Sequence, residues 1–145
     1  MASPERRFTG TYLHTLDDRG RIALPAKLRE CLGDKVAVTN GFAPNTLVVY
    51  PEHTWEKFSD RLLEAPAVNE AANDARLYYF GNAWEGAIDN QGRIPLPDYM
   101  REFANLSNEV AVVGAGDHIV IWDRQEWIAK RAALRANRPV IDSLR

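Results

Sequence analysis

The sequence predicts a single α+β domain in which two β-β-α-β-β halves pack together as an intramolecular pseudo-dimer. Three observations point to this fold. The chain repeats itself at an offset of 72 residues, from Asp17 to Asp89, and strand and turn signals recur in the same order in each half. With 145 residues in total, each half alone is too short to bury a stable core. We therefore expect the two halves to share one core.

The repeat is clearest in the segments 17–25 and 89–97, which read DDRGRIALP and DNQGRIPLP. A second match pairs LVVY at 47–50 with IVIW at 119–122, and a tryptophan follows each of these segments five residues later. Chance is a poor explanation for so many identities without an alignment gap inside the motif. We therefore assign the elements of the second half by their counterparts in the first.

The first half contains the signals of its elements in order. An aspartate and a glycine mark a turn, because aspartate caps turns and glycine supplies a positive φ. Pro25 begins a short helix, since proline is tolerated at the first helical position. The apolar runs on either side of Asn40-Gly41 form a hairpin. The expected elements are strand 12–16, turn 17–20, strand 22–24, helix 26–31, and strands 36–39 and 47–50.

The second half repeats this order, and helical segments follow each half. Trp55, Phe58 and Leu62 recur at a spacing that places them on one helical face. We expect strands 83–88 and 93–96, helix 98–103, strands 110–113 and 119–122, and helices 51–64, 68–80 and 123–135. The domain then covers 8–135, as repeats 8–64 and 80–135 linked by the helical segment 66–80, with a flexible extension at 1–7 and a frayed tail at 136–145.

The composition is that of an ordinary globular protein, with 46% apolar and 26% charged residues. The net charge is −2, whereas a typical DNA-binding domain is basic, so a nucleic-acid partner requires a local basic patch. Cys31 is the single cysteine, which excludes an internal disulfide and a cysteine-based zinc site. No signal peptide is visible and no apolar run is long enough to span a membrane. We therefore expect a cytoplasmic protein without a membrane partner.

Each repeat places an arginine, Arg21 or Arg93, directly after a glycine turn at the tip of an expected hairpin. A two-stranded ribbon fits the major groove of B-DNA, where arginine donates two parallel hydrogen bonds to O6 and N7 of guanine. The alternative is that each arginine only pairs with the aspartate four residues before it and stabilises the turn. Residue types alone favour this structural role. The repetition of Gly-Arg at the same place in both halves weighs toward DNA contact, for which Arg21 is the first candidate and Arg93 the second.

Aspartates in these motifs would be repelled by phosphate. We therefore expect Asp17 and Asp89 to accept hydrogen bonds from N–H groups of the turn, or to pair with the arginine and fix its direction. Gly20 and Gly92 complete the shape of the motif.

Neighbouring polar residues receive other roles. Arg19 and Lys27 are candidates for phosphate contacts, which position a protein on DNA without reading its sequence. Gln91 stands where the first motif has Arg19 and can donate to phosphate or base. Arg29 and Arg101 each precede a glutamate on a short helix, so structural pairing is expected for both.

These residues resemble the MraZ family, whose pattern is a strand, Asp-x-x-Gly-Arg, a hydrophobic residue, x-Leu-Pro and a short helix carrying arginine, given twice. The resemblance covers residues 8–127. It implies an AbrB-like swapped-hairpin β-barrel formed by the two repeats, with helices packed outside. It also implies transcriptional control of the division and cell wall gene cluster, autoregulation, binding to upstream DNA repeats, a ring-shaped homo-oligomer, a place in the nucleoid, and DNA contact by Arg21 and Arg93.

Two other classes of function stay open. A ring-forming scaffold or an antitoxin-like interaction protein is the second candidate, although a scaffold has no need for Gly-Arg twice at one place. An enzyme is the third, because related barrels host catalysis. The sequence shows no nucleophile with a base, no carboxylate pair and no cofactor loop. His14, His53 and His118 lack metal-ligand spacing, so we expect no metal, no cofactor and no small-molecule substrate.

Overall fold

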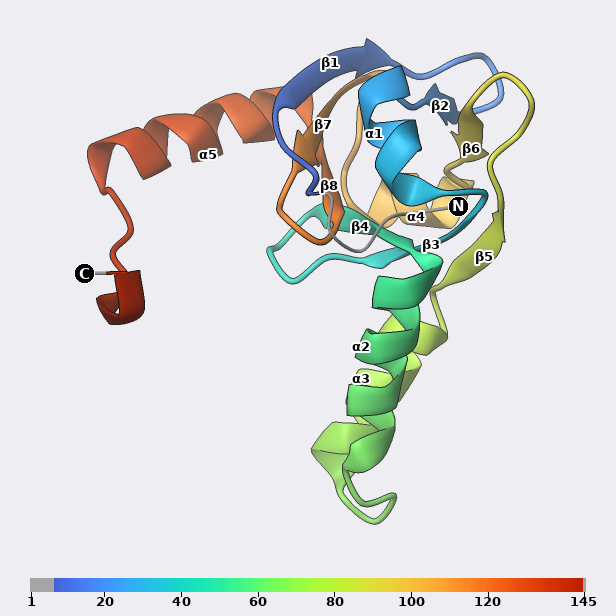
Figure 1. Cartoon of the computed structure of the whole chain (residues 1–145), viewed down its shortest axis with the longest axis vertical. Coiled ribbons are helices and arrows are strands. Elements are labelled where there is room, and N and C mark those ends of the chain that lie inside the picture. Colours follow the sequence, from blue (N-terminus) through green and yellow to red (C-terminus); the bar gives the residue numbers. More distant parts are fainter. Residues whose placement is uncertain (1–6, 145) are drawn as a thin grey trace.

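The computed structural model describes residues 7–144, and residues 1–6 of the expected N-terminal extension lie outside the described residues. The chain forms a large antiparallel sheet, a separate two-stranded ribbon and helices around them (Figure 1). Every expected strand and helix is confirmed, with ends within two residues of the expected ones. The elements are β1 (Thr11–Thr15), β2 (Arg21–Ala23), α1 (Ala26–Leu32), β3 (Lys35–Asn40), β4 (Thr46–Pro51), α2 (Glu52–Glu64), α3 (Glu70–Phe80), β5 (Trp84–Ala87), β6 (Arg93–Pro95), α4 (Asp98–Phe103), β7 (Glu109–Gly114), β8 (Ile119–Asp123), α5 (Arg124–Ala136) and a 3-10 turn (Asp142–Leu144).

Strands of the two repeats pair with one another. β1 of the first half pairs antiparallel with β7 of the second, and β5 of the second half pairs with β3 of the first. β2 and β6 form the two-stranded ribbon. The large sheet has the order β1-β7-β8-β4-β3-β5, so β1 and β5 are its edges. Backbone hydrogen bonds therefore join the two halves, as expected of an intramolecular pseudo-dimer.

The expected hairpin between β1 and β2 is wrong beyond its turn. The N–H of Asp17 donates to the carbonyl of Arg21 at 3.0 Å, and the N–H of Gly20 donates to the carbonyl of Asp17 at 2.9 Å. Past this point the two strands separate, and β2 pairs with β6 instead. That pairing places Ile22 opposite Ile94, and both side chains are fully buried. Burying two isoleucines in a shared core stabilises the fold more than extending a local hairpin would.

One hydrophobic core draws on equivalent positions of both halves. Ile22 and Ile94, like Leu24 and Leu96, are at most 3% exposed. Burying an aliphatic side chain of this size contributes about 1.5–3 kcal/mol, so each half depends strongly on the other. Further equivalent pairs in the same cluster are Leu28 and Met100, Val38 and Val110, Leu47 and Ile119, and Val49 and Ile121.

Helical segments project from the sheet in two directions (Figure 1). α2 and α3 form a helical hairpin that is anchored to the sheet by the buried Trp55. α5 leaves the sheet at Asp123, whose carboxylate accepts hydrogen bonds from the N–H groups of Ser107 and Gln125. Its Trp127 is buried beside β7. None of the helices in residues 7–144 has the length and apolar character to cross a membrane.

Candidate nucleic-acid interface

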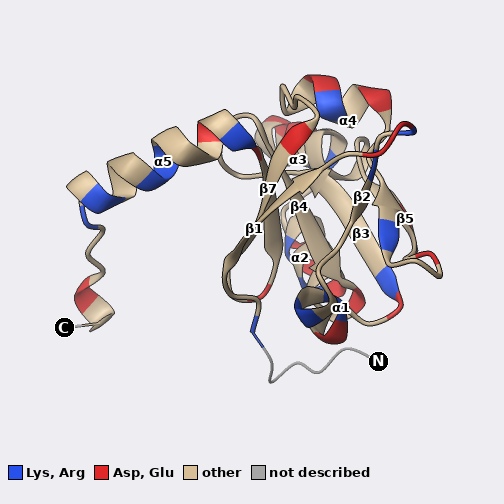
Figure 2. Cartoon of the chain, turned by 90° about the horizontal axis from the view of Figure 1, so that it is seen from above, with Lys and Arg blue, Asp and Glu red and all other residues tan. Residues whose placement is uncertain are grey.

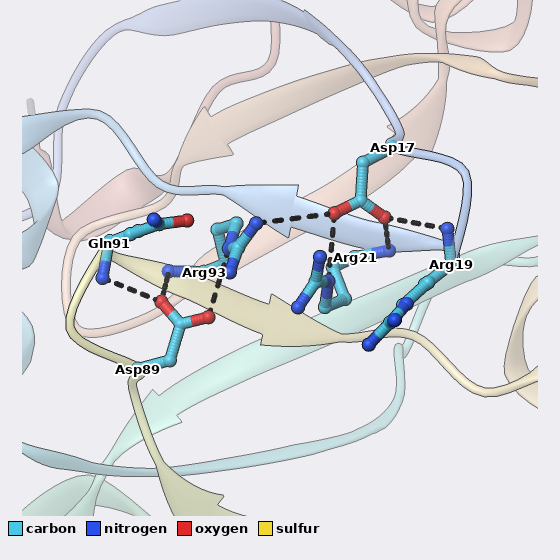
Figure 3. Close-up of polar contacts among 6 residues, drawn as sticks. All are labelled: Asp17, Arg19, Arg21, Asp89, Gln91 and Arg93. Carbon is cyan, nitrogen blue, oxygen red and sulfur yellow. Dashed lines mark hydrogen bonds and ion pairs between the residues drawn. The ribbon is translucent and has the colours of Figure 1, made fainter.

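Asp17 organises the turn of the first motif through three short hydrogen bonds. Its Oδ1 accepts from the backbone N–H of Arg19 at 2.9 Å and from that of Arg21 at 2.8 Å. Its Oδ2 accepts from Nε of the Arg21 side chain at 2.8 Å (Figure 3). Gly20 has a φ of 72°, in the left-handed region that favours glycine. Asp17 therefore does both things expected of it, holding the turn and pairing with the arginine.

The second motif has the same network. Oδ1 of Asp89 accepts from the backbone N–H of Gln91 at 2.9 Å and from that of Arg93 at 2.8 Å, and Oδ2 accepts from Nε of Arg93 at 2.9 Å. Gly92 has a φ of 76°. The change from Arg19 to Gln91 leaves this backbone network intact, because only the N–H of that residue takes part.

Each aspartate binds Nε and leaves the far end of the guanidinium available. A guanidinium has five N–H donors, and Asp17 uses one of those of Arg21. No hydrogen bond or ion pair among the described residues engages the terminal Nη atoms of Arg21, while Nη1 of Arg93 lies 3.8 Å from Oδ2 of Asp17. The ion pairs thus direct both arginines. Within the described residues, Arg21 keeps both terminal nitrogens for a bidentate contact, whereas Nη1 of Arg93 is already near Asp17.

The ribbon presents both arginines on one face. In its register Arg21 lies opposite Pro95, and Arg93 lies opposite Ala23. Directly opposed residues of an antiparallel pair point to the same side, and the buried isoleucines between them point to the other. Arg21 and Arg93 are therefore diagonal neighbours on the outer face, with 27% and 26% of their side chains exposed.

The turn geometry stabilises the ionised form of both aspartates. The hydrogen bond from the backbone N–H of Arg21 is the largest cause that lowers the pKa of Asp17 below 3.8, and Arg93 does the same for Asp89. Both carboxylates are consequently charged at neutral pH, and each arginine keeps its ionic partner there.

Each motif glycine packs against an arginine from the opposite half, which sequence reasoning missed. A Cβ on Gly20 would overlap the guanidinium of Arg101, on α4, and a Cβ on Gly92 would lie 2.7 Å from Cδ of Arg29, on α1. The structural pairing expected of these two arginines is present, but with partners other than the ones that the sequence suggested. Arg101 pairs with Asp98, and Nε of Arg29 donates to the carbonyl of Leu24 at 3.0 Å. The equal spacing of Gly and Arg in both repeats was the only signal in the sequence.

The remaining predicted contact residues are exposed but lie in different places. Arg19 and Gln91 occupy equivalent positions in the two turns, beside the ribbon arginines (Figure 3). Lys27 is exposed on α1, outside the ribbon. Segment 17–30 holds four basic and three acidic residues, and segment 89–102 holds two basic and three acidic ones. The basic surface of one chain is thus modest and stronger at the first motif.

Comparisons with known proteins agree with the duplication. A family model described as "MraZ protein, putative antitoxin-like" matches residues 7–77 and 79–138, two segments that correspond to the two repeats. The chain is 38% identical over 130 residues to the transcriptional regulator MraZ of Desulforamulus reducens, which covers 90% of this chain and 91% of that protein.

Two further relatives carry the same name, transcriptional regulator MraZ. The protein from Moorella thermoacetica is 42% identical over 120 residues, 83% of each chain. The protein from Roseiflexus castenholzii is 35% identical over 130 residues, 90% of each chain. Transcriptional regulators are not enzymes, so the relatives give no support to a catalytic role. The duplicated motif, the two matched segments and these identities together show that the chain belongs to the MraZ family.

Proposed function

We propose that this protein is a DNA-binding transcriptional regulator that reads guanines in the major groove with Arg21 and Arg93. The observation that carries this proposal is the pair of arginines on the outer face of one two-stranded ribbon, each held through Nε by an aspartate. A ribbon of this kind fits the major groove, and a bidentate arginine–guanine pair contributes about 1–3 kcal/mol of discrimination. The name of the relatives, transcriptional regulator, supports the same function.

The two motifs contribute unequally in this proposal. Arg19 adds a positive charge beside Arg21 and contacts phosphate, as does Lys27, and these contacts position the protein on the duplex. The second motif has Gln91 in place of Arg19 and a net acidic surrounding segment. Gln91 donates to phosphate or base there. We therefore expect Arg21 to carry more sequence preference than Arg93.

Oligomerisation compensates for the modest basic surface of one chain. A homo-oligomer that presents several ribbons to repeated sites raises affinity through effective concentration. The family resemblance supports a ring, a swapped-hairpin barrel in each subunit, and upstream repeats of the division and cell wall gene cluster as the DNA sites. It also supports autoregulation and a place in the cytoplasm on the nucleoid.

Fluorescence-anisotropy titration tests this function. The chain is titrated onto labelled DNA from upstream of its own gene and onto a scrambled duplex, across a salt series, for wild type, Arg21→Ala and Arg93→Ala. Wild type is expected to prefer its own upstream DNA. Arg21→Ala should lose most of that preference while its circular dichroism and mass in solution stay unchanged, and Arg93→Ala should lose less.

The second candidate is an interaction protein without sequence-specific DNA binding, and the words "antitoxin-like" in the family description favour it. In that case the Asp–Arg pairs only stabilise the turns. Equal affinity of wild type for both duplexes at every salt concentration would contradict the regulator and support this candidate.

A further inference from the structure

The C-terminal helix has no packing partner over most of its length. In α5 Arg124 is half-buried and Trp127 is buried, whereas every residue from Ile128 to the helix end is exposed. Ile128 and Leu134 are 43% and 38% exposed. Helices of this length are marginal in water by themselves, and most of their stability comes from packing an amphipathic face. The exposed length of α5 is therefore suited to a docking role.

One face of α5 combines positive charge with apolar side chains. Ile128, Arg131 and Arg135 recur at i, i+3 and i+7, which places them on the same side, and Leu134 lies next to Arg131. Arg131 and Arg135 form no ion pair with any residue in 7–144, and Figure 2 shows basic residues along the helix as it extends away from the body. Over residues 124–138 there are five basic residues against Glu126. We call Ile128, Arg131, Leu134 and Arg135 the α5 face.

An acidic groove of matching character lies along α2. Four acidic residues follow that helix at intervals of four, and all are exposed and lack an ion pair within the described part of the chain. They are Glu52, Glu56, Asp60 and Glu64. The first three border a groove of about 480 Å³, together with Glu85, Lys35, Ser59 and an apolar floor of Trp55, Val36, Gly86 and Ala87. Nε1 of Trp55 donates to Glu85 at 3.1 Å, which holds that carboxylate at the groove edge.

The two surfaces also agree in length. The acidic residues that border the groove, from Glu52 to Asp60, span eight residue steps, or about 12 Å, and the α5 face from Ile128 to Arg135 spans seven steps, or about 11 Å. They cannot meet within one chain in this fold, because α5 packs on β7 and β8 and points away, while the groove lies between α2 and the β3–β5 edge (Figure 1). A second copy can bring them together.

We propose that the α5 face of one copy docks in the acidic groove of the next copy, with Arg131 and Arg135 against Glu56 and Asp60. Such an interface joins two different surfaces, so it repeats head to tail and closes into a ring when the rotation between copies allows it. This inference rests on the proposed function, because it names the contact that would assemble the oligomer proposed there. DNA is the weaker candidate for this face, because α5 and the β2–β6 ribbon lie on opposite sides of the sheet body (Figures 1 and 2).

Charge reversal tests the contact. Two double variants are made, Arg131→Glu/Arg135→Glu and Glu56→Arg/Asp60→Arg. At a concentration where wild type is assembled, light scattering should give each variant the mass of a single chain, 16.4 kDa. Mixing the two should restore the wild-type mass, because each altered surface then meets its complement. The matched control compares two single substitutions, Lys130→Glu and Arg135→Glu, which change the charge by the same amount. Lys130 lies on another side of the helix, so Lys130→Glu should leave the mass unchanged.

Several outcomes overturn the inference. If the variant Arg131→Glu/Arg135→Glu keeps the wild-type mass, α5 does not hold the copies together. Two disrupted chains that do not reassemble on mixing, although circular dichroism shows both folded, contradict the pairing of these surfaces. Loss of DNA affinity with unchanged mass assigns the α5 face to DNA. The proposed function fails separately, if an assembled wild type shows no preference for its own upstream DNA.

Discussion

Replacing Gly20 by alanine is expected to lower the free energy of unfolding by about 1–3 kcal/mol. A φ of 72° costs an L-residue about 1–2 kcal/mol. The new Cβ also meets the guanidinium of Arg101, which is the end of a flexible side chain and can move into solvent. The lost pair with the exposed Asp98 adds about 0–1 kcal/mol.

Alanine at Gly92 should cost more, because the arginine that it meets is held in place. The backbone cost is the same, since φ is 76°. The new Cβ lies 2.7 Å from Cδ and Nε of Arg29, and that Nε donates to the carbonyl of Leu24. Moving the side chain breaks a charged hydrogen bond worth about 1.5–3 kcal/mol. The total loss is therefore about 2.5–5 kcal/mol.

Gly116 provides the matched control. Its φ is 91°, and a Cβ there would meet nothing within 4 Å, so Gly116→Ala carries the backbone cost alone, about 1–2 kcal/mol. Urea unfolding followed by tryptophan fluorescence measures all three variants, at one protein concentration because assembly adds to apparent stability. The expected order of loss is Gly92→Ala, then Gly20→Ala, then Gly116→Ala. Equal losses at the three positions would refute the packing of each motif glycine against an arginine of the other half.

Three further predictions concern the motif charges. Asp17→Asn keeps an oxygen for the turn N–H groups but loses the ion pair, so the chain should stay folded and lose DNA preference in anisotropy competition; unchanged preference would count against directed pairing of Arg21. The lowered pKa values of Asp17 and Asp89 mean that the stability they contribute is fully present above pH 3.8 and is lost as the pH falls through their lower folded values. Carboxyl NMR titration checks this, and a value at or above 3.8 would contradict it. Arg19→Ala should reduce the slope of log affinity against log salt by about 0.9 and leave the ratio of specific to scrambled affinity unchanged.

Local features of this fold could be predicted because their causes are local in sequence. The helix at Asp98–Phe103 follows a proline and has the expected bounds. The Asp17 turn was predictable because aspartate, glycine and arginine stand at the spacing that the hydrogen bonds require. Because the sequence repeats, the same reasoning predicts a helix after a proline and an aspartate-centred turn in each half.

Partners distant in the sequence were predicted less well. The pairing of β2 with β6 depends on Ile22 and Ile94 meeting in a shared core, and nothing near either residue encodes that choice. The packing of Arg29 against Gly92 depends in the same way on how the halves are placed. The α5 face and the acidic groove are visible as charge patterns, but their separation within one chain appears only in three dimensions.

Removing single acceptor atoms from the DNA tests most directly whether Arg21 reads guanine. In the upstream repeat that wild type binds, each guanine is replaced in turn by 7-deazaguanine, which lacks the N7 acceptor, and affinity is measured for wild type and Arg21→Ala. We predict that one replacement weakens wild-type binding by about fivefold or more and leaves Arg21→Ala unaffected. Equal responses of the two proteins at every guanine would contradict the contact and leave Arg21 as a turn-stabilising residue.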